Sequence, residues 1–142
     1  MNVAEILRNK GSRIVSVQPS DTVVAAAALL SREGIGAVLV RDGDRVAGIL
    51  SERDIVRCVA AHGEGALRLP VSDTMTRGVV FCSPQDSIDE VMSLMTERRF
   101  RHLPVQEHGK LVGLVSIGDV VKRRIESTER EARALREYIA TG

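Results

Sequence analysis

Hydrophobic and polar positions alternate in blocks along this chain, and the blocks predict short strands separated by helices. Apolar runs of four or five residues, bounded by Gly, Pro or Asp, are typical of buried strands. Apolar residues at helical spacing predict helices over 23–32 and 88–98, and two further helices begin near Glu52 and Ile117. The strands predicted in this way cover residues 14–17, 37–40, 46–50, 79–82, 102–105 and 111–115.

Turn and capping residues indicate how these elements connect. Arg41–Asp44 and Gln106–Gly109 are short polar segments of the kind that joins the two strands of a hairpin. Thr22 and Ser87 precede the two helical patterns and can cap them, and Ser87 with Glu90 forms a capping-box pattern. The predicted order is strand, helix, strand, strand, helix, and it occurs twice.

The second half of the chain repeats the first at an offset of 65 residues. Residues 19–57 and 84–122 share eight identities in 39 positions without a gap. Upstream, residues 3–7 match residues 71–75 after a three-residue slip. Because a half of about 60 residues buries too little apolar surface alone, we expect the two halves to pack face to face on their sheets.

The predicted fold class is α+β, with two tandem β-α-β-β-α repeats related by pseudo-two-fold symmetry and followed by a long C-terminal helix. We assign residues 1–60 to the first repeat and 71–125 to the second. Residues 61–70 form a Gly-rich linker, and residues 126–142 form a helical extension.

Composition narrows the classes of partner. Hydrophobic residues make up 44% of the chain but aromatic residues only 2%, so the core must be aliphatic. A net charge of +1 provides no broad basic field, which argues against bulk binding to nucleic acid or an anionic membrane. The longest apolar run, 23–30, is far shorter than the roughly 20 residues that span a bilayer. With no signal-peptide pattern, we expect a cytoplasmic protein.

Residues with metal or catalytic chemistry are few and scattered. Cys58 and Cys82 lie in apolar surroundings and favour two buried thiols, with a disulfide as the alternative. His62 and His108 have no partners at metal-ligand spacing, and His108 falls in a predicted turn. We therefore expect no metal site, no required cofactor and no enzymatic activity.

One motif stands at the same strand-to-helix junction in both repeats. Gly48, Ser51 and Asp54 form a Gly-x-x-Ser-x-x-Asp pattern, which Gly113-Leu-Val-Ser116-Ile-Gly-Asp119 repeats. Glycine permits close backbone approach to a ligand, and the Ser hydroxyl with the first helical N–H groups can bind phosphate or ribose oxygens. A carboxylate one turn later can accept hydrogen bonds from ribose hydroxyls. Ordinary helix capping is the alternative, and the occurrence of all three residues in both halves favours a ligand.

With these motifs, residues 3–125 resemble a tandem pair of CBS domains, and 101–105 (Arg-His-Leu-Pro-Val) resemble the family's second-strand signature. The resemblance implies a disc-like pair with two clefts, usually dimerised. The clefts would bind adenosine compounds such as AMP, ADP, ATP, S-adenosylmethionine or a dinucleotide such as NAD. Carried over residue by residue, Ser51 and Asp54 would serve one cleft, and Ser116 and Asp119 the other.

The resemblance also suggests further contacts in each cleft. Arg99, Arg101 and His102 could meet phosphate where the first repeat has two glycines and an alanine, so we expect unequal clefts; Arg53 is a further candidate. The alternative is that these arginines form a solvated rim with Glu97 or Glu107. The candidates for an adenine pocket are Val17, Cys82, Val38, Leu103 and Pro104.

The C-terminal helix carries its own pattern. Apolar or small residues spaced 4, 3, 4, 3 and 4 form a heptad seam flanked by charges: Val121, Ile125, Thr128, Ala132, Leu135 and Ile139. About two and a half heptads make an independent coiled coil marginal. The seam indicates a dimer contact or an effector-docking helix, or alternatively a helix packed back on its own module.

Together these features predict a non-enzymatic regulatory module that binds adenine nucleotides and signals to a separate partner, in the manner of an energy sensor. We expect a homodimer. The alternative is a structural or interaction protein with empty clefts, in which the C-terminal helix is the functional part.

Overall fold

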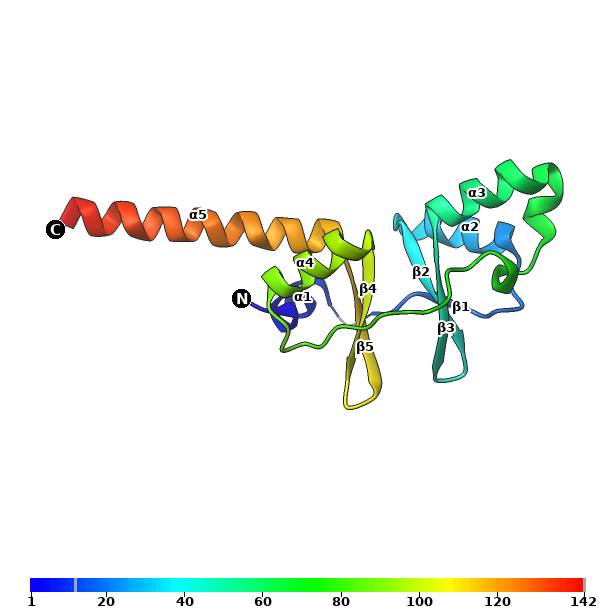
Figure 1. Ribbon diagram of the computed structural model, residues 1–142, viewed down its shortest axis with the longest axis horizontal. Helices are drawn as coiled ribbons and strands as arrows, with labels where there is room; N and C mark the ends of the chain where they lie inside the picture. Colours follow the sequence, from blue (N-terminus) through cyan, green and yellow to red (C-terminus); the bar gives the residue numbers. More distant parts are fainter. Residues whose placement is uncertain (12, 142) are drawn as a thin grey trace. The chain divides into compact units, whose positions relative to one another are not determined.

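The computed structural model describes residues 1–11 and 13–141, and its contacts divide the chain into two compact units. Unit 1 contains Met1–Arg13 and Phe81–Gly142, whereas unit 2 is the continuous segment Ile14–Val80. The elements of unit 1 are α1 (Val3–Lys10), α4 (Ile88–Arg98), β4 (His102–Glu107), β5 (Lys110–Ser116) and α5 (Ile117–Thr141) (Figure 1). Those of unit 2 are β1 (Ser16–Val17), α2 (Val23–Glu33), β2 (Ala37–Asp42), β3 (Arg45–Ser51), α3 (Glu52–His62) and the 3₁₀ helices η1 (Gly63–Arg68) and η2 (Val71–Asp73).

Unit 2 is built on a three-stranded sheet in the order β1-β2-β3. β1 pairs parallel to β2, and β2 and β3 form the predicted antiparallel hairpin. The core beneath the sheet is aliphatic, as the composition requires, and includes Leu30, Val40 and Leu50. The predicted linker, residues 61–70, packs on this unit through η1, where Ala66 is fully buried beside Val23 and Cys58.

Unit 1 contains the second hairpin, β4-β5, in the same antiparallel register. Its turn places His108 and Gly109 at φ values of 52° and 76°, the backbone that two-residue hairpin turns require. The strand expected at 79–82 is wrong: of these residues Cys82 alone is paired, in an isolated parallel bridge to Val105. Residues 79–81 have no ladder partner, and two backbone bonds at Cys82, to Pro104 and from Gln106, replace the strand.

Each short segment that precedes a repeat in the sequence packs in the unit that is formed by the other repeat. The N-terminal residues pack in unit 1, where Val3 N donates to Asp86 O (3.0 Å) and Ala4 N to Pro84 O (2.9 Å). In unit 2 the matching bonds are Val71 N to Asp21 O (2.7 Å) and Ser72 N to Pro19 O (3.0 Å). The two sets of bonds are equivalent under the sequence repeat. Each unit therefore completes its fold with the lead-in segment that precedes the other repeat along the chain.

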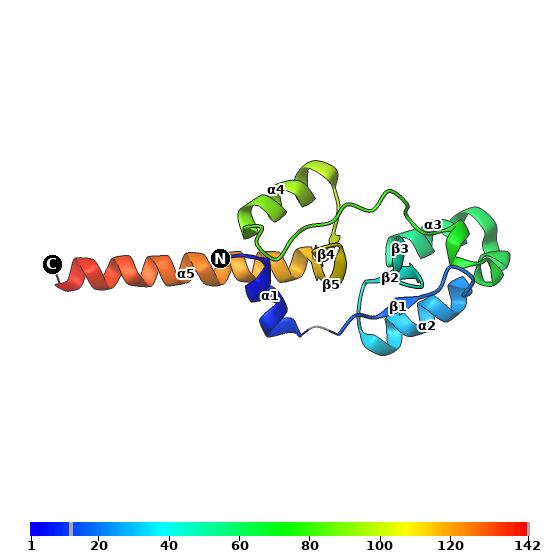
Figure 2. The same ribbon diagram turned by 90° about the horizontal axis from the view of Figure 1, so that it is seen from below.

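Helix α5 differs from its counterpart α3 mainly in length. Its first turns pack on α4 and α1, while its C-terminal part extends beyond both of these helices in Figures 1 and 2. Val120 is the buried residue of this helix. Within the described part of the chain, no helix combines the length and apolarity needed to cross a bilayer.

Candidate functional site

The first motif lies where β3 runs into α3. Ser51 caps the helix by accepting a bond from Asp54 N (3.2 Å), and Asp54 Oδ2 accepts one from Ser51 N (3.0 Å). This reciprocal pair is a capping box, in which side chains satisfy backbone donors that a helix start leaves unpaired. The capping alternative raised by the sequence is thus realised. Asp54 is also buried, with 9% of its surface exposed, so it is held rigidly.

The second motif, between β5 and α5, folds in the same way. Asp119 Oδ2 accepts from Ser116 N (2.9 Å), and Asp119 N donates to Ser116 Oγ (3.1 Å). The same residue types at the same spacing therefore produce one local geometry in both units. Each motif presents a fixed hydroxyl, a fixed carboxylate and a helix N-terminus, where a partial positive charge favours an anion.

A further contact to the carboxylate distinguishes the two motifs. In unit 2, Thr76 Oγ1 donates to Asp54 (3.2 Å to Oδ1 and 3.3 Å to Oδ2). In unit 1, Lys10 Nζ lies 2.7 Å from Asp119 Oδ2 and donates also to Leu114 O at 3.0 Å. Burial alone would raise the pKa of Asp119, but the bond and charge of Lys10, with the bonds from Ser116, outweigh it and hold that pKa below its usual value.

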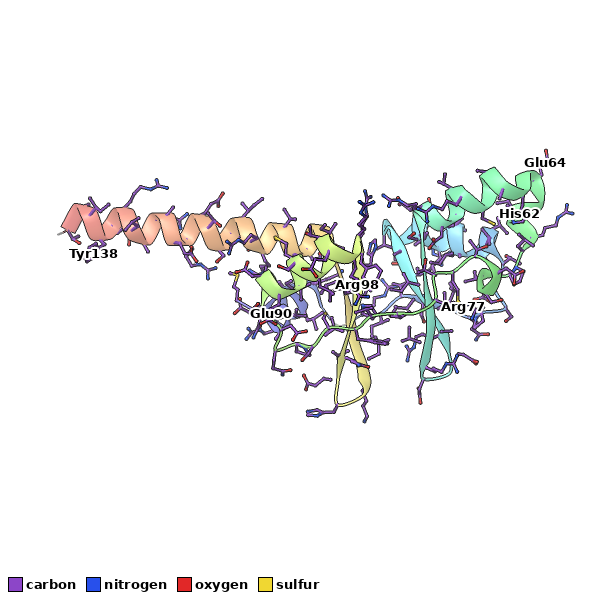
Figure 3. All side chains as sticks on the ribbon, in the orientation of Figure 1. His62, Glu64, Arg77, Glu90, Arg98 and Tyr138 are labelled. Atoms are coloured by element: carbon purple, nitrogen blue, oxygen red, sulfur yellow. The ribbon has the colours of Figure 1, made fainter. Side chains whose placement is uncertain are left out.

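Sequence reasoning did not single out Lys10 or Thr76. Both follow the short segments 3–7 and 71–75, whose similarity across the repeat was the signal that could have found them. Arg77 comes next to Thr76 and donates to Ser72 O at 3.0 Å (Figure 3). The site residues therefore come from the lead-in segment of each unit as well as from the motif.

The motif glycines have a structural role that corrects the expectation of close approach to a ligand. A Cβ added at Gly48 would lie 2.7 Å from both Met75 Sδ and Thr76 O. One added at Gly113 would lie 2.6 Å from Leu7 Cδ2. Leu7 and Met75 are equivalent under the repeat, so each glycine leaves room for the lead-in segment of its unit. Close approach here is to the chain itself.

Strand pairing decides which of the basic candidates lie next to a motif. His102 pairs with Ser116, and Ile117 N donates to Arg101 O at 2.8 Å, so both basic residues adjoin the second motif. In unit 2 the equivalent neighbours of Ser51 are Ala37 and Gly36. The junction in unit 1 thus carries Lys10, Arg101 and His102, whereas the junction in unit 2 carries small or neutral residues at the same places.

The other two phosphate candidates are exposed and less closely tied to the motifs. Arg53 lies in the first turn of α3, immediately before Asp54. Arg99 ends α4 in the left-handed conformation at φ 57°, where the first repeat has Gly34 at φ 65°. A non-glycine residue pays a steric cost in this conformation, so the backbone of Arg99 is strained.

The five adenine-pocket candidates are core residues. Val17 and Val38 belong to the hydrophobic cluster of unit 2, and Leu103, Pro104 and Cys82 are buried in unit 1. Burial, together with the nearby charge of Asp86, raises the pKa of the Cys82 thiol to about 12, so it stays protonated. The side chains of these five residues pack in the cores of the two units.

The other cysteine, histidine and acidic side chains considered among the described residues lie outside the two motifs. Both cysteines are free thiols, as expected, and His108 is exposed. Among residues 1–11 and 13–141, no three His, Cys, Asp or Glu side chains gather as metal ligands would. A shallow hollow on α4 is lined by Asp86, Asp89, Glu90 and Glu97, and such a set of carboxylates is unsuited to a phosphate (Figure 3 labels Glu90).

Comparison with known proteins agrees with this arrangement. A family model of the CBS domain matches the chain twice, over residues 3–61 and 71–126. The mitochondrial CBS domain-containing protein CBSX3 of Arabidopsis thaliana is 31% identical over 149 aligned positions, which cover 99% of this chain and 72% of that protein. The crystal structure of the CBS-domain containing protein ATU1752 from Agrobacterium tumefaciens is 45% identical, with a TM-score of 0.85, and the match covers 87% of this chain and 99% of that one. A crystal structure of CBSX2 in complex with AMP shares the fold at 24% identity and a TM-score of 0.72, over 89% of this chain and 98% of that one.

Proposed function

This chain belongs to the CBS-domain family and carries two such domains in tandem, and from this premise we propose that it binds adenine nucleotides at its two Ser–Asp motifs as a regulatory module without catalytic activity. Ser51 and Asp54 would serve one nucleotide, and Ser116 and Asp119 a second. The ligand would be AMP, ADP, ATP or another adenosine compound such as NAD. Binding would regulate a separate partner protein in the cytoplasm and report the energy state of the cell.

The observation that carries the proposal is the reciprocal Ser–Asp bonding that the two motifs share. Helix capping accounts for one Ser and one Asp at a helix start, and at the second motif it leaves one carboxylate oxygen of Asp119 available. An ionised carboxylate accepts about four hydrogen bonds. The bonds from Ser116 N and Lys10 Nζ both reach Asp119 Oδ2, so Oδ1 can receive the hydroxyls of a ribose. CBSX2, which shares this fold, has been crystallised in complex with AMP.

The difference in charge between the two junctions supports unequal ligands. Lys10, Arg101 and His102 gather at the second motif, where a nucleotide with more phosphates would gain more attraction. Ala37 and Thr76 occupy the corresponding places at the first motif. We therefore assign the more highly charged nucleotide to Ser116 and Asp119, and AMP or adenosine to Ser51 and Asp54.

The experiment is calorimetric titration and thermal unfolding with AMP, ADP, ATP, NAD, S-adenosylmethionine and GTP. A ligand that binds the folded state raises the unfolding midpoint by mass action. We expect adenine compounds to bind wild type, and Asp54→Ala/Asp119→Ala to lose that binding. Thr22→Ala/Ser87→Ala is the matched control, because it removes the caps of α2 and α4 and leaves the motifs intact.

Two outcomes would contradict the proposal. Equal loss of binding in the control pair would show that general destabilisation, and not the motif carboxylates, is responsible. No binding of any compound would favour the alternative function, an interaction protein that acts through its C-terminal helix. Conversion of a bound nucleotide during incubation would identify an enzyme instead.

A further inference from the structure

Helix α5 exposes large aliphatic residues along one face. Val121, Ile125, Leu135 and Ile139 are exposed by 41, 53, 59 and 68% respectively, although all are large aliphatic residues. The opposite side of the helix is the one that packs on unit 1. There, Val120 is buried and Arg123 donates to Glu5 O of α1 at 3.2 Å. The alternative of a helix packed back on its own module therefore does not hold for the large residues of the seam, which are exposed.

The seam has the heptad spacing of a two-stranded coiled coil. Its large residues stand at both ends, and Thr128 and Ala132 are at the centre. The C-terminal part of the helix extends beyond α1 and α4, and Tyr138 lies near its end (Figures 1 and 3). No segment of unit 1 covers this stretch in the described chain, because α4 and α1 contact the helix only near its start.

The charges beside the seam fit a second copy of the same helix in parallel. In a parallel pair, the residue just before one core position faces the residue five places later on the partner helix. Arg124 then faces Glu129 of the second copy, and Glu131 faces Arg136 of the second copy. Symmetry doubles each pair, so four opposite-charge contacts flank the seam. Arg124 also pairs with Asp89 of its own α4 at 3.2 Å.

The antiparallel arrangement is disfavoured by the same charges. Its best apolar register places Ile125 against Leu135 of the second copy. In that register Glu129 faces Glu129 of the second copy, and Glu131 faces Glu131 of the second copy. Lys122 also faces a positively charged residue there. Like charges at such positions are destabilising. Apolar matching permits both directions, and charge selects the parallel one.

We propose that α5 forms a parallel, in-register two-stranded coiled coil with a second copy of this chain, centred between Thr128 and Ala132. The inference rests on the helix alone and does not depend on nucleotide binding. Because the seam is short and its centre carries small residues, the dimer should dissociate reversibly on dilution. Both modules of a dimer would then project from the same end of the coiled coil.

The test is sedimentation equilibrium of the full chain without nucleotide, with two charge variants. Glu131→Arg turns both of its contacts with Arg136 repulsive and should weaken dimerisation roughly tenfold. Glu131→Arg/Arg136→Glu restores opposite charges and should restore the dimer. Neither residue has an opposite charge at four-residue spacing in its own helix, so helicity is preserved.

The relative direction of the two helices is tested by oxidising the Leu135→Cys variant. Its two sulfur atoms would meet across a parallel seam, but they would lie about ten residues apart, roughly 15 Å, in the antiparallel register. Glu137→Cys, on the outer face, is the matched control. We expect a covalent dimer from Leu135→Cys and none from the control. A monomeric wild type, or a dimer indifferent to Glu131→Arg, would overturn the proposal. Either result would leave the nucleotide titrations unaffected.

Discussion

Lys10 and Asp119, 109 residues apart in sequence, form an ion pair with Nζ 2.7 Å from Oδ2. The pair joins the last turn of α1 to the first turn of α5, and it therefore links the exchanged N-terminal segment to the second motif. The carboxylate in the other unit, Asp54, accepts from the Thr76 hydroxyl instead. The two motifs thus differ in the group that bonds to the carboxylate, which is an ammonium at Asp119 and a neutral hydroxyl at Asp54.

The first prediction concerns the dependence of stability on pH. The pKa of Asp119 is lowered in the folded protein. The stabilisation that this carboxylate contributes is therefore complete above its pKa in the unfolded chain, about 3.9, and is lost as pH falls through its pKa in the folded protein. Lys10→Met should therefore lower the free energy of unfolding by up to about 1 kcal/mol at pH 5 to 7, because the pair is partly exposed. Below about pH 4 the difference from wild type should shrink.

Urea unfolding at a series of pH values measures this difference. Lys110→Met, which alters another exposed lysine of unit 1, is the control and should change stability little at any pH. Added salt should weaken the effect of Lys10→Met by screening the pair. A deficit that persists unchanged to pH 2.5 would show that Lys10 acts through packing or through its bond to Leu114 O, and not through Asp119.

The second prediction concerns the motif glycines. Gly48→Ala should lower the free energy of unfolding by about 2 to 3 kcal/mol, because its Cβ would meet the carbonyl oxygen of Thr76, which cannot move aside. Gly113→Ala should cost only about 1 kcal/mol, since the obstructing atom is the mobile end of Leu7. Gly65→Ala, which has open space, is the control.

Denaturant titration of these variants gives the comparison, and Leu7→Ala adds a test of cause. The double variant Gly113→Ala/Leu7→Ala should lose less unfolding free energy than the two single variants lose in sum, because the shortened side chain removes the clash. Strict additivity would mean that the glycine serves something other than room for Leu7.

The third prediction concerns the end of α4. Arg99→Gly should raise the free energy of unfolding by up to about 1 kcal/mol, because glycine adopts the left-handed backbone there without steric cost. Arg98→Gly, at the last residue of the helix, should lower stability by up to about 1 kcal/mol and is the matched comparison (Figure 3). Thermal unfolding of the pair decides whether the strain at Arg99 is real, and a destabilised Arg99→Gly would contradict it.

The fourth prediction concerns phosphate recognition. Arg101→Ala should weaken ATP binding roughly tenfold, the loss of one charged hydrogen bond, and leave adenosine within about twofold. Arg45→Ala, an exposed arginine of unit 2, should affect neither ligand. Isothermal titration with both compounds measures the ratio. Equal weakening of ATP and adenosine would assign Arg101 to the solvated rim suggested as the alternative.

Local sequence patterns were sufficient to predict most elements and both motifs. The helix at Ile88–Arg98 was placed at its observed bounds, and the hairpins differ from expectation by one or two residues at their ends. Ser87 caps α4 by accepting from Glu90 N at 3.0 Å, which is one of the two bonds that the capping-box pattern predicts. Periodicity and capping act within a few residues, and such features can be read without knowing the long-range contacts.

Long-range pairing could not be predicted in the same way. Residues 3–7 and 71–75 are similar, and each could fit either half, so the sequence does not indicate that they exchange units. The roles of Lys10 and Thr76 at the two carboxylates depend on this exchange. The strand expected at 79–82 fails for a related reason, because a β-prone segment becomes a strand only where a neighbour offers its backbone.

The exchanged lead-in segments set the order in which the protein can be completed during synthesis. Unit 2 is continuous, Ile14–Val80, so all of its residues are synthesised before those of β4. Helix α1 is made first, but its partners follow Phe81. Synthesis proceeds at about 5 to 20 residues per second. The apolar face of α1, which includes Val3 and Ile6, therefore lacks its packing partners for several seconds. During that interval nascent-chain chaperones could bind the apolar face of this helix.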